Sequence, residues 1–326
     1  MNDIKEYIAE LIAECLNNKY GIDEIKKCSD LRSIGFSSLN AIEVVTEIES
    51  KYDVEFAEEI LSIENLSSVD DIYSAYLLCL SNEEERVNAW NLVGGLFWQE
   101  GRVSARPNDN DIESFLSGAE NKKIAVIGAS TKYLIEKAAT ISSNVYVLDF
   151  SEKMISDLKE VLGDKCSYIK YDILKGERLD QKFDLIISDR LVNRFTYWEA
   201  VNVIKNSIAM LEENGVVKHA IKLGNYELDN RLIAYAKGNG LALDFWDEET
   251  KTIDYTKTKD FLFGCIKEHG NISKDILYKW YLGRGRESRF DHKDIVDIVN
   301  SADGKLVSDD NYEANAETRI FCISRR

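Results

Sequence analysis

The most constraining feature of the sequence is a regular alternation of short apolar runs with segments of helical periodicity, which begins at residue 122. Apolar runs of strand length occupy residues 122–128, 144–149, 168–172, 183–189 and 215–222. The segments between them, such as residues 151–162 and 197–211, have helical spacing. Alternating strands and helices form parallel sheets covered by helices on both faces. We therefore predict an α/β fold with a doubly wound, mostly parallel sheet, in which residues 318–324 form a final strand.

A smaller and more acidic unit precedes this sheet. Residues 1–80 carry a net charge of −11, whereas the rest of the chain carries −6. Apolar residues recur at helical spacing over residues 3–16, 39–48 and 68–80, which predicts a small helical bundle. The sole proline, Pro107, lies in a polar stretch between the two parts. We therefore expect a helical bundle at 1–80, a linker with a lead-in helix at 81–112, and an α/β domain at 113–326.

The composition excludes several kinds of partner and site. A net charge of −17 disfavours nucleic acid and anionic membranes as partners. No apolar run is long enough to cross a bilayer, and the acidic first residues do not form a signal peptide, so we expect a soluble, cytoplasmic chain. The six cysteines are scattered without a Cys-x-x-Cys pair and there are only three histidines, so we expect neither a disulfide framework nor a metal site.

A pair of serines opens the second predicted helix of the bundle. Residues 35–39 read Gly-Phe-Ser-Ser-Leu, and the acidic residues Glu43 and Glu47 follow. A phosphodiester on a serine at this position would lie against free backbone N–H groups and the positive end of the helix dipole. The plainer interpretation is that Ser37 and Ser38 only cap the helix.

Taken together, residues 1–80 resemble an acyl or peptidyl carrier domain. The signature of that family is Gly-x-Asp-Ser-Leu followed by an acidic helix, and here Ser37 stands in place of the aspartate. The resemblance implies that Ser38 carries a covalent 4′-phosphopantetheine arm. It also implies a phosphopantetheinyl transferase and other assembly-line enzymes as partners, which the acidic helix would attract through basic patches.

Polar residues stand at the ends of the predicted strands of the larger unit. Gly128 permits a tight turn after the first strand, and Asp149, Asp172 and Asp189 end the next three. Because the carboxyl ends of parallel strands meet at one edge, these residues indicate a site for an adenosine-containing ligand. Each aspartate alone could be an ordinary capping residue. A nicotinamide-binding domain would require Gly-x-Gly-x-x-Gly after the first strand, which is absent.

Residues 113–326 resemble the class I S-adenosylmethionine-dependent methyltransferases, which have a Rossmann-like sheet. Residues 145–154 read Val-Tyr-Val-Leu-Asp-Phe-Ser-Glu-Lys-Met, similar to the family's Val-x-Gly-x-Asp-x-Ser-x-x-Met, whereas the first loop departs from Gly-x-Gly-x-Gly. The resemblance implies that Asp149 holds the ribose, Asp172 the adenine amino group, and residues 128–131 the methionine end. It also implies that the final strand, residues 318–324, is an antiparallel edge strand. The cofactor-binding residues that it implies are Gly128, Ala129, Ser130, Asp149, Phe150, Met154, Asp172, Ile173 and Asp189.

The acceptor side of the site is less sharply defined. His219, near the end of the fifth strand, is a candidate general base oriented by Glu227, or else a half-exposed strand residue. An inserted lid at residues 254–293 contains Tyr255, Arg284 and Arg286, which are candidates for binding the phosphopantetheine phosphate or a substrate carboxylate. The alternatives for this arginine-rich segment are a solvated loop or a docking patch for the carrier.

From these features we predict a fusion of a carrier with a methyltransferase, in polyketide, nonribosomal peptide or related biosynthesis. The second domain would methylate an acyl or aminoacyl thioester tethered to its own carrier, where tethering replaces a bimolecular encounter with a high effective concentration. The accepting atom can be carbon, oxygen or nitrogen. The alternatives are a degenerate, non-catalytic methyltransferase fold that serves as a docking scaffold, or a fold reused for other chemistry on the thioester.

Overall fold

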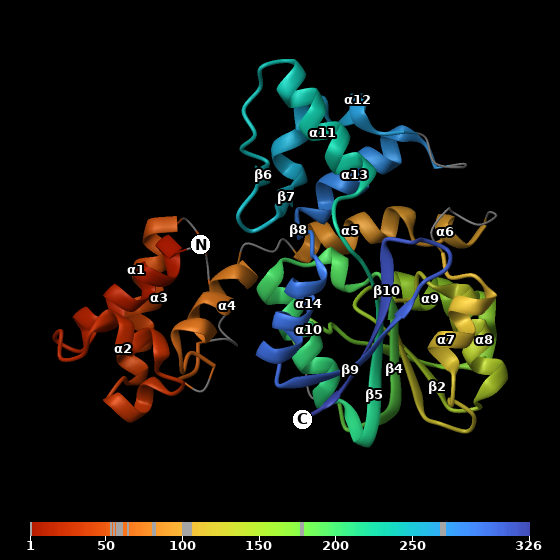
Figure 1. Ribbon diagram of the computed structural model, residues 1–326, viewed down its shortest axis with the longest axis horizontal. Coiled ribbons are helices and arrows are strands. Elements are labelled where there is room, and N and C mark those ends of the chain that lie inside the picture. Colours follow the sequence, from red (N-terminus) through yellow and green to blue (C-terminus); the bar gives the residue numbers. More distant parts are fainter. Residues whose placement is uncertain are drawn as a thin grey trace. The chain divides into compact units, whose positions relative to one another are not determined.

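The chain consists of two compact units, Met1–Asn82 and Glu83–Arg326. The computed structural model describes residues 2–52, 54, 56, 61–63, 65–79, 83–99, 106–176, 179–267 and 272–326 (Figure 1). Within these ranges, no helix is both long and apolar enough to cross a membrane.

The first unit is a bundle of helices. Its elements are α1 (Asn2–Cys15), α2 (Ile22–Lys27), the 3-10 turn η1 (Leu31–Ile34), α3 (Ser38–Tyr52) and α4 (Val69–Cys79). Helix α3 buries Ala41, Val44, Val45 and Ile48, and a face built on these positions leaves Leu39 on the opposite side. Leu39 and Ile42, two apolar residues of the helix predicted over 39–48, lie outside this buried face, because they are 78% and 51% exposed.

The second unit contains a seven-stranded sheet. Its strands are β1 (Ile124–Ile127), β2 (Val145–Asp149), β3 (Ser167–Lys170), β4 (Phe183–Asp189), β5 (Leu211–Lys222), β9 (Gly304–Asn311) and β10 (Thr318–Arg325), in the order β3-β2-β1-β4-β5-β10-β9. The first five strands in this order pair in parallel, whereas β10 is antiparallel to both of its neighbours. The predicted doubly wound, mostly parallel sheet is therefore confirmed.

The position of the last strand differs from the prediction. Strand β10 is not at the edge, because β9 lies outside it. Apolar periodicity does not predict strand β9, because its sequence, Gly-Lys-Leu-Val-Ser-Asp-Asp-Asn, is mostly polar and exposed. Such a composition is typical of an edge strand.

Helices cover both faces of the sheet. Helices α7 (Asp109–Leu116), α8 (Lys132–Ile141) and α9 (Glu152–Leu162) lie on one face, and α10 (Tyr197–Ala209) and α14 (His292–Ser301) lie on the other (Figure 1). Alternate strand residues such as Ile124 and Val126 pack with Leu134 and Leu158 in one buried cluster. This period-two burial follows from the pleat of the strands and fixes their register.

A subdomain is inserted between β5 and α14. It comprises α11 (Glu227–Gly238), β6 (Trp246–Asp247), β7 (Thr252–Asp254), η5 (Tyr255–Thr258), α12 (Lys259–Cys265), α13 (Lys274–Arg284) and β8 (Arg286–Ser288). The three strands form a separate antiparallel sheet. The lid expected at 254–293 is thus the later part of a larger insertion that already begins with α11.

The helix that the sequence analysis assigned to a linker belongs to this subdomain. Helix α5 (Glu83–Val93), followed by α6 (Leu96–Gln99), contributes Ala89 and Val93 to a buried cluster that also contains Leu228, Tyr255 and Trp280. Residues 81–112 are therefore not simply a connection, since their described helices lie within the second unit.

Close packing of α13 on α5 gives the first testable prediction. A Cβ atom on Gly283 would lie 2.7 Å from the Ala89 Cβ and 2.9 Å from the Glu85 carbonyl oxygen. We expect Gly283→Val to lower the free energy of unfolding of the second unit by about 1–3 kcal/mol, because the helices must separate. All five tryptophans lie in this unit, so urea unfolding followed by tryptophan fluorescence reports on it.

The matched control is Gly264→Ala on α12. A Cβ atom there would meet no atom within 4 Å. This substitution should raise the free energy of unfolding by about 0.5–1 kcal/mol, because alanine has the higher helix propensity. Equal effects of the two substitutions would contradict the packing described for α13.

Candidate functional site

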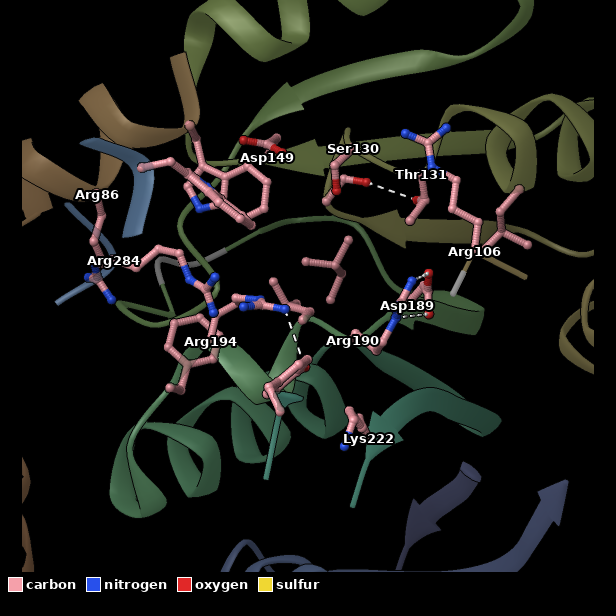
Figure 2. A pocket seen from close by; sticks show the side chains of 18 of the residues that line it. Arg86, Arg106, Ser130, Thr131, Asp149, Asp189, Arg190, Arg194, Lys222 and Arg284 are labelled. Atoms are coloured by element: carbon pink, nitrogen blue, oxygen red, sulfur yellow. Dashed lines mark hydrogen bonds and ion pairs between the residues drawn. The ribbon is translucent and has the colours of Figure 1, made fainter. Parts of the chain in front are cut away.

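A cavity of about 980 Å³ lies in the second unit, where the carboxyl ends of β1, β2 and β4 meet the inserted subdomain. Its wall includes the loop after β1, the residues that follow β2 and β3, the turn after β4, and side chains of α5, α11 and α13. Figure 2 shows ten of its residues, Arg86, Arg106, Ser130, Thr131, Asp149, Asp189, Arg190, Arg194, Lys222 and Arg284, arranged around it.

The loop after β1 turns at Gly128. This residue has φ of 99°, in the left-handed region that favours glycine, and a Cβ atom there would meet no atom within 4 Å. Gly128, Ser130 and Thr131 line the cavity, and the Thr131 hydroxyl donates to the Gly128 carbonyl at 3.1 Å. Ala129, which was expected among the cofactor contacts, is fully buried instead. One glycine thus leaves open space beside the loop even though the usual further glycines are replaced.

Asp149 fastens this loop to the end of β2. Its carboxylate accepts hydrogen bonds from the backbone N–H groups of Ala129, at 2.7 Å, and Ser151, at 2.8 Å. Burial raises the pKa of Asp149 to about 6, against the lowering effect of the two N–H donors. Asp149 and Phe150 line the cavity, and each carboxylate oxygen keeps a second lone pair for a hydroxyl of a ligand.

The ends of β3 and β4 supply two further carboxylates. Asp172 accepts the N–H of Leu174 at 2.9 Å, and both Asp172 and its neighbour Ile173 line the cavity. Asp189 also lines the cavity, but its carboxylate accepts the Arg190 guanidinium at 3.1 and 3.2 Å. Asp189 is therefore occupied as the counter-charge of Arg190, which limits the cofactor role expected of it.

The expected pair of His219 and Glu227 is not formed. His219 is fully buried in β5, where its Nδ1 lies 2.6 Å from the hydroxyl of Ser188 on β4, and it does not line the cavity. Glu227 lines the cavity at its exposed side and binds Lys267 and Arg231 instead. The prediction of a histidine base oriented by Glu227 is corrected accordingly, because the pleat of β5 turns residue 219 into the core.

Met154 and Arg286 also lie outside the cavity. Met154 is buried at 1% exposure in the cluster beneath α9, and Arg286 is exposed on β8. Tyr255 and Arg284 do line the cavity, but the Arg284 guanidinium is bound to Glu287 at 2.6 and 2.5 Å. The expected cluster of arginines 284–289 therefore does not present three free cations to a ligand.

Several cationic residues of the cavity were not found from the sequence. They are Arg86, Arg106, Arg190, Arg194, Lys222, Arg231 and Lys267. They are scattered over most of the second unit, so no local run of basic residues marks them. The available signal was that Arg190 directly follows a strand-end aspartate. In the structure Arg190 has φ of 52°, in the left-handed region that non-glycine residues seldom adopt.

In the first unit, the start of α3 is capped by Ser37, the residue before Ser38. Ser38 is the first residue of α3 and is exposed. The backbone N–H of Asn40 donates to the Ser37 hydroxyl at 3.4 Å, and the N–H of Ser37 donates to the Asn40 side chain at 3.0 Å. This reciprocal arrangement is a capping box, in which serine replaces aspartate at little cost. Ser38 is thus left available for a covalent group.

In the described ranges, no group of three or more histidine, cysteine, aspartate and glutamate side chains is placed to hold a metal ion.

The buried state of His219 gives a prediction about stability and pH. Burial lowers the pKa of His219 to about 4, so the folded chain binds this proton less readily than the unfolded chain does. Its contribution to stability is complete above about pH 6.5 and decreases by about 3 kcal/mol as the pH falls to 4. We expect His219→Gln, measured by urea unfolding between pH 7 and 4, to remove this part of the pH dependence. An unchanged pH dependence would contradict a neutral, buried His219.

Comparisons with known proteins bear on both units. Residues 6–75 match the family model described as a phosphopantetheine attachment site, and Ser38 lies within this match. No curated protein matches the chain.

Two solved structures resemble the larger part of the chain. A protein from Rhodobacter sphaeroides, provisionally described as a Zn-dependent alcohol dehydrogenase, is 35% identical with a TM-score of 0.70, and the match covers 74% of this chain and 99% of that one. The methyltransferase CcbJ from Streptomyces caelestis is 13% identical with a TM-score of 0.50, and the match covers 74% of this chain and 98% of that one. The chain therefore belongs to the same family as the Rhodobacter sphaeroides protein, and it joins a phosphopantetheine attachment domain to a Rossmann-like fold similar to that of the methyltransferase CcbJ.

Proposed function

We propose that this chain is a carrier–methyltransferase fusion that methylates an acyl or aminoacyl group held as a thioester on a phosphopantetheine arm at Ser38. The observation that carries the proposal is the presence, in one chain, of an exposed helix-opening serine and a cavity at the strand ends of a methyltransferase fold. Such fusions suit polyketide, nonribosomal peptide or related biosynthesis, in which intermediates stay tethered to carriers.

The capping geometry supports the carrier half of the proposal. Because Ser37 and Asn40 already satisfy the start of α3, the plainer interpretation of Ser38 as a cap loses its support. A phosphate on Ser38 would lie at the N-terminal end of a 15-residue helix, where backbone N–H groups and the helix dipole favour an anion.

The residues of the cavity fit S-adenosylmethionine. The open space beside Gly128 leaves room for the methionine end along residues 128–131. Asp149 retains acceptor capacity for the ribose hydroxyls, and Asp172 lies close by, beside Ile173, to accept the adenine amino group. When bound, this cofactor supplies an electron-poor methyl group, and the enzyme's part is largely to position the acceptor in line with it.

The relative's provisional description suggests another activity, the zinc-dependent oxidation of an alcohol. The described residues that line the cavity include neither a cysteine nor a histidine, which are the usual ligands of zinc in such enzymes. The donor set at this site therefore favours methyl transfer. Titration with a nicotinamide cofactor and with zinc, beside S-adenosylmethionine, separates the two activities.

The carrier half is tested by loading with a phosphopantetheinyl transferase and coenzyme A. We expect the intact chain to gain the mass of one phosphopantetheine and Ser38→Ala to gain none. Ser37→Ala should still be loaded, although loss of the cap should cost about 1 kcal/mol of stability in the first unit. Loading is measured by intact-protein mass spectrometry. Loading of Ser38→Ala would contradict the proposal that the arm is attached at Ser38.

The cofactor half is tested by titration calorimetry with S-adenosylmethionine at several pH values. Because the pKa of Asp149 is about 6, the carboxylate that accepts the ribose hydroxyls is present at neutral pH and is lost on acidification. The dissociation constant should therefore rise by up to about tenfold for each pH unit below 6. Asp149→Ala should weaken binding on the order of tenfold to hundredfold at pH 7.5.

The matched control is Asp164→Ala, which removes an exposed carboxylate in the turn after α9. It should leave both the affinity and its pH dependence unchanged. No measurable heat with the intact chain at high cofactor concentration would favour the alternative function, a non-catalytic docking scaffold for the carrier.

A further inference from the structure

The inner wall of the cavity contains a buried cluster with more positive than negative charge. We call it the arginine cluster: Arg194, Arg284, Arg289, Asp229 and Glu287. Glu287 is fully buried and accepts hydrogen bonds from all three guanidinium groups, at 2.5 and 2.6 Å from Arg284, 3.1 Å from Arg289 and 3.3 Å from Arg194. One carboxylate is thus shared by three cations.

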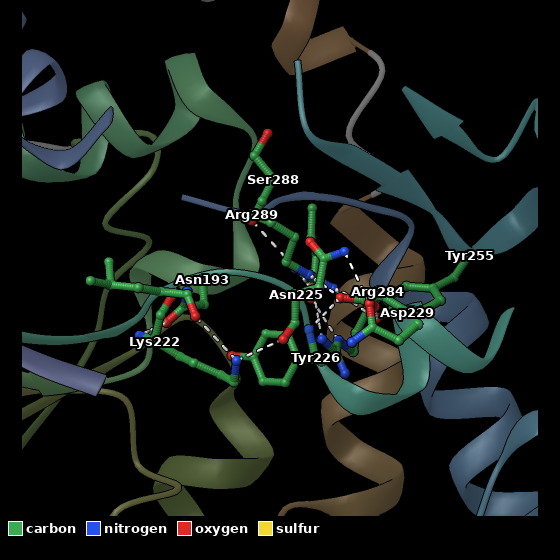
Figure 3. Close-up of polar contacts among 12 residues, drawn as sticks. Asn193, Lys222, Asn225, Tyr226, Asp229, Tyr255, Arg284, Ser288 and Arg289 are labelled. Carbon is green, nitrogen blue, oxygen red and sulfur yellow. Dashed lines mark hydrogen bonds and ion pairs between the residues drawn. The ribbon is translucent and has the colours of Figure 1, made fainter. Parts of the chain in front are cut away.

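The second carboxylate of the cluster is committed to Arg289. Asp229 accepts from the Arg289 Nε at 2.6 Å and from its Nη2 at 3.1 Å, and it also accepts the Tyr255 hydroxyl at 3.0 Å (Figure 3). Among the residues that the structure describes, no further carboxylate forms an ion pair with the cluster. The cluster therefore carries a net charge of +1.

Three other cations of the cavity wall are each matched to one carboxylate. Arg190 pairs with Asp189 at 3.1 Å, and Lys222 pairs with Glu317 at 2.8 Å. Arg86 is 3.6 Å from Glu199. The arginine cluster differs from these pairs because it has three cations for two carboxylates, and its Arg194 and Arg284 line the cavity.

Arg194 is the member of the cluster that a ligand can reach. Its side chain is 18% exposed, against 5% for Arg284 and 1% for Arg289. The residue before it, Asn193, exchanges two hydrogen bonds with the backbone of Lys222, at 2.8 and 2.9 Å, and so fixes the turn that carries Arg194 (Figure 3). Figure 2 shows Arg194 and Arg284 beside each other at the cavity.

The surroundings of these two arginines are aromatic. The rings of Tyr255, Trp280 and Tyr281 lie 5.2, 4.5 and 4.8 Å from the Arg284 guanidinium, and the Tyr226 ring lies 5.5 Å from that of Arg194. These ring faces offset part of the cost of a surplus buried charge, and without a full counter-charge the rest of that cost remains in the free protein. A bound anion removes that cost, and the planar fork of arginine suits a carboxylate.

We propose that Arg194, assisted by Arg284, binds a carboxylate carried by the acyl cargo, so that the substrate class is the thioester of a dicarboxylic acid. This inference rests on the proposed function, because it takes the cargo to be a thioester on the Ser38 arm. Two other anions are available, the phosphate of the arm and the methionine carboxylate of the cofactor, and the proposed function places the latter along residues 128–131. The phosphate joins the arm to Ser38, so it enters the cavity after the cargo and would meet Lys267, which is 69% exposed. The cargo is at the free end of the arm and enters first. The buried position of the cluster therefore favours a carboxylate on the cargo.

The experiment measures binding of two probes that differ only in charge. They are malonyl-pantetheine and its amide, malonamyl-pantetheine, titrated into the full chain carrying Ser38→Ala so that no arm competes. We expect the carboxylate probe to bind about tenfold or more tightly than the amide. Arg194→Gln should reduce this preference to about twofold or less, whereas Arg286→Gln, which removes an exposed arginine outside the cavity, should preserve it.

The stability of the variants distinguishes binding from a structural role. Glutamine at position 194 removes the surplus charge, so the unliganded Arg194→Gln chain should unfold at the same urea concentration as the parent or a higher one. Arg194→Lys keeps the charge without the fork and should retain a smaller preference for the carboxylate. The proposal would be overturned if Arg194→Gln strongly destabilised the chain and Arg194→Lys preferred the carboxylate probe over the amide probe as much as the parent does.

Two further outcomes also overturn it. Equal affinities of the parent for the two probes would show that the cluster does not recognise a carboxylate. Tighter binding of acetyl-phosphopantetheine than of acetyl-pantetheine, lost in Arg194→Gln, would assign the cluster to the phosphate of the arm.

The two proposals fail separately. A chain that shows the carboxylate preference but no heat with S-adenosylmethionine retains the anion site and loses the methyltransferase function. A chain that methylates a neutral acyl thioester without any carboxylate preference retains the function and loses the anion site.

Discussion

Parallel pairing of β1 with β2 and β4 is the constraint on which the rest of the second unit depends. Parallel strands need crossover helices, and these bring the carboxyl ends of all the strands to one edge. That edge is where the chain leaves each strand with unpaired backbone groups, so Asp149 can accept two N–H groups from two different turns. The carboxylate therefore fixes the shape of the loop after β1 without a glycine-rich sequence, and the cavity follows from that shape.

A second constraint acts where the inserted subdomain meets the sheet. The turn after β4 is held to β5 through Asn193 and to β8 through the hydrogen bond from the Ser288 N–H to the Phe195 carbonyl, at 3.0 Å. Glu287 then binds arginines from the turn, from the end of α13 and from the residue after β8. The insertion is thus fixed by buried polar contacts as well as by the apolar cluster around Trp280, and it forms a wall of the cavity instead of a loosely attached lid.

Much of the fold was predictable because apolar periodicity is a local property of the sequence. Strands such as β1 and β4 are buried on both faces, so they read as continuous apolar runs, whereas β9 is an exposed edge strand and reads as polar. The site was predictable only where a motif lies on consecutive residues, as at Asp149. Arg194 and Glu287 are 93 residues apart and meet through the insertion, which no spacing rule reveals. The prediction of His219 as a base failed because its position near the end of β5 suggests the cavity, whereas the pleat of the strand turns its side chain into the core.

The arginine cluster can be recognised as a binding site because it lacks one negative charge. A buried network that served stability alone would balance its charges, because an uncompensated buried cation costs free energy in every molecule that holds no ligand. Here two carboxylates serve three guanidinium groups, and the least buried of the three faces the cavity. Replacement of Arg194 by a neutral residue of similar shape would correct the imbalance, while Glu287 keeps its bonds to Arg284 and Arg289 and Asp229 keeps its bonds to Arg289. The charge of Arg194, the most exposed of the three arginines, is therefore better explained by recognition of an anion than by folding.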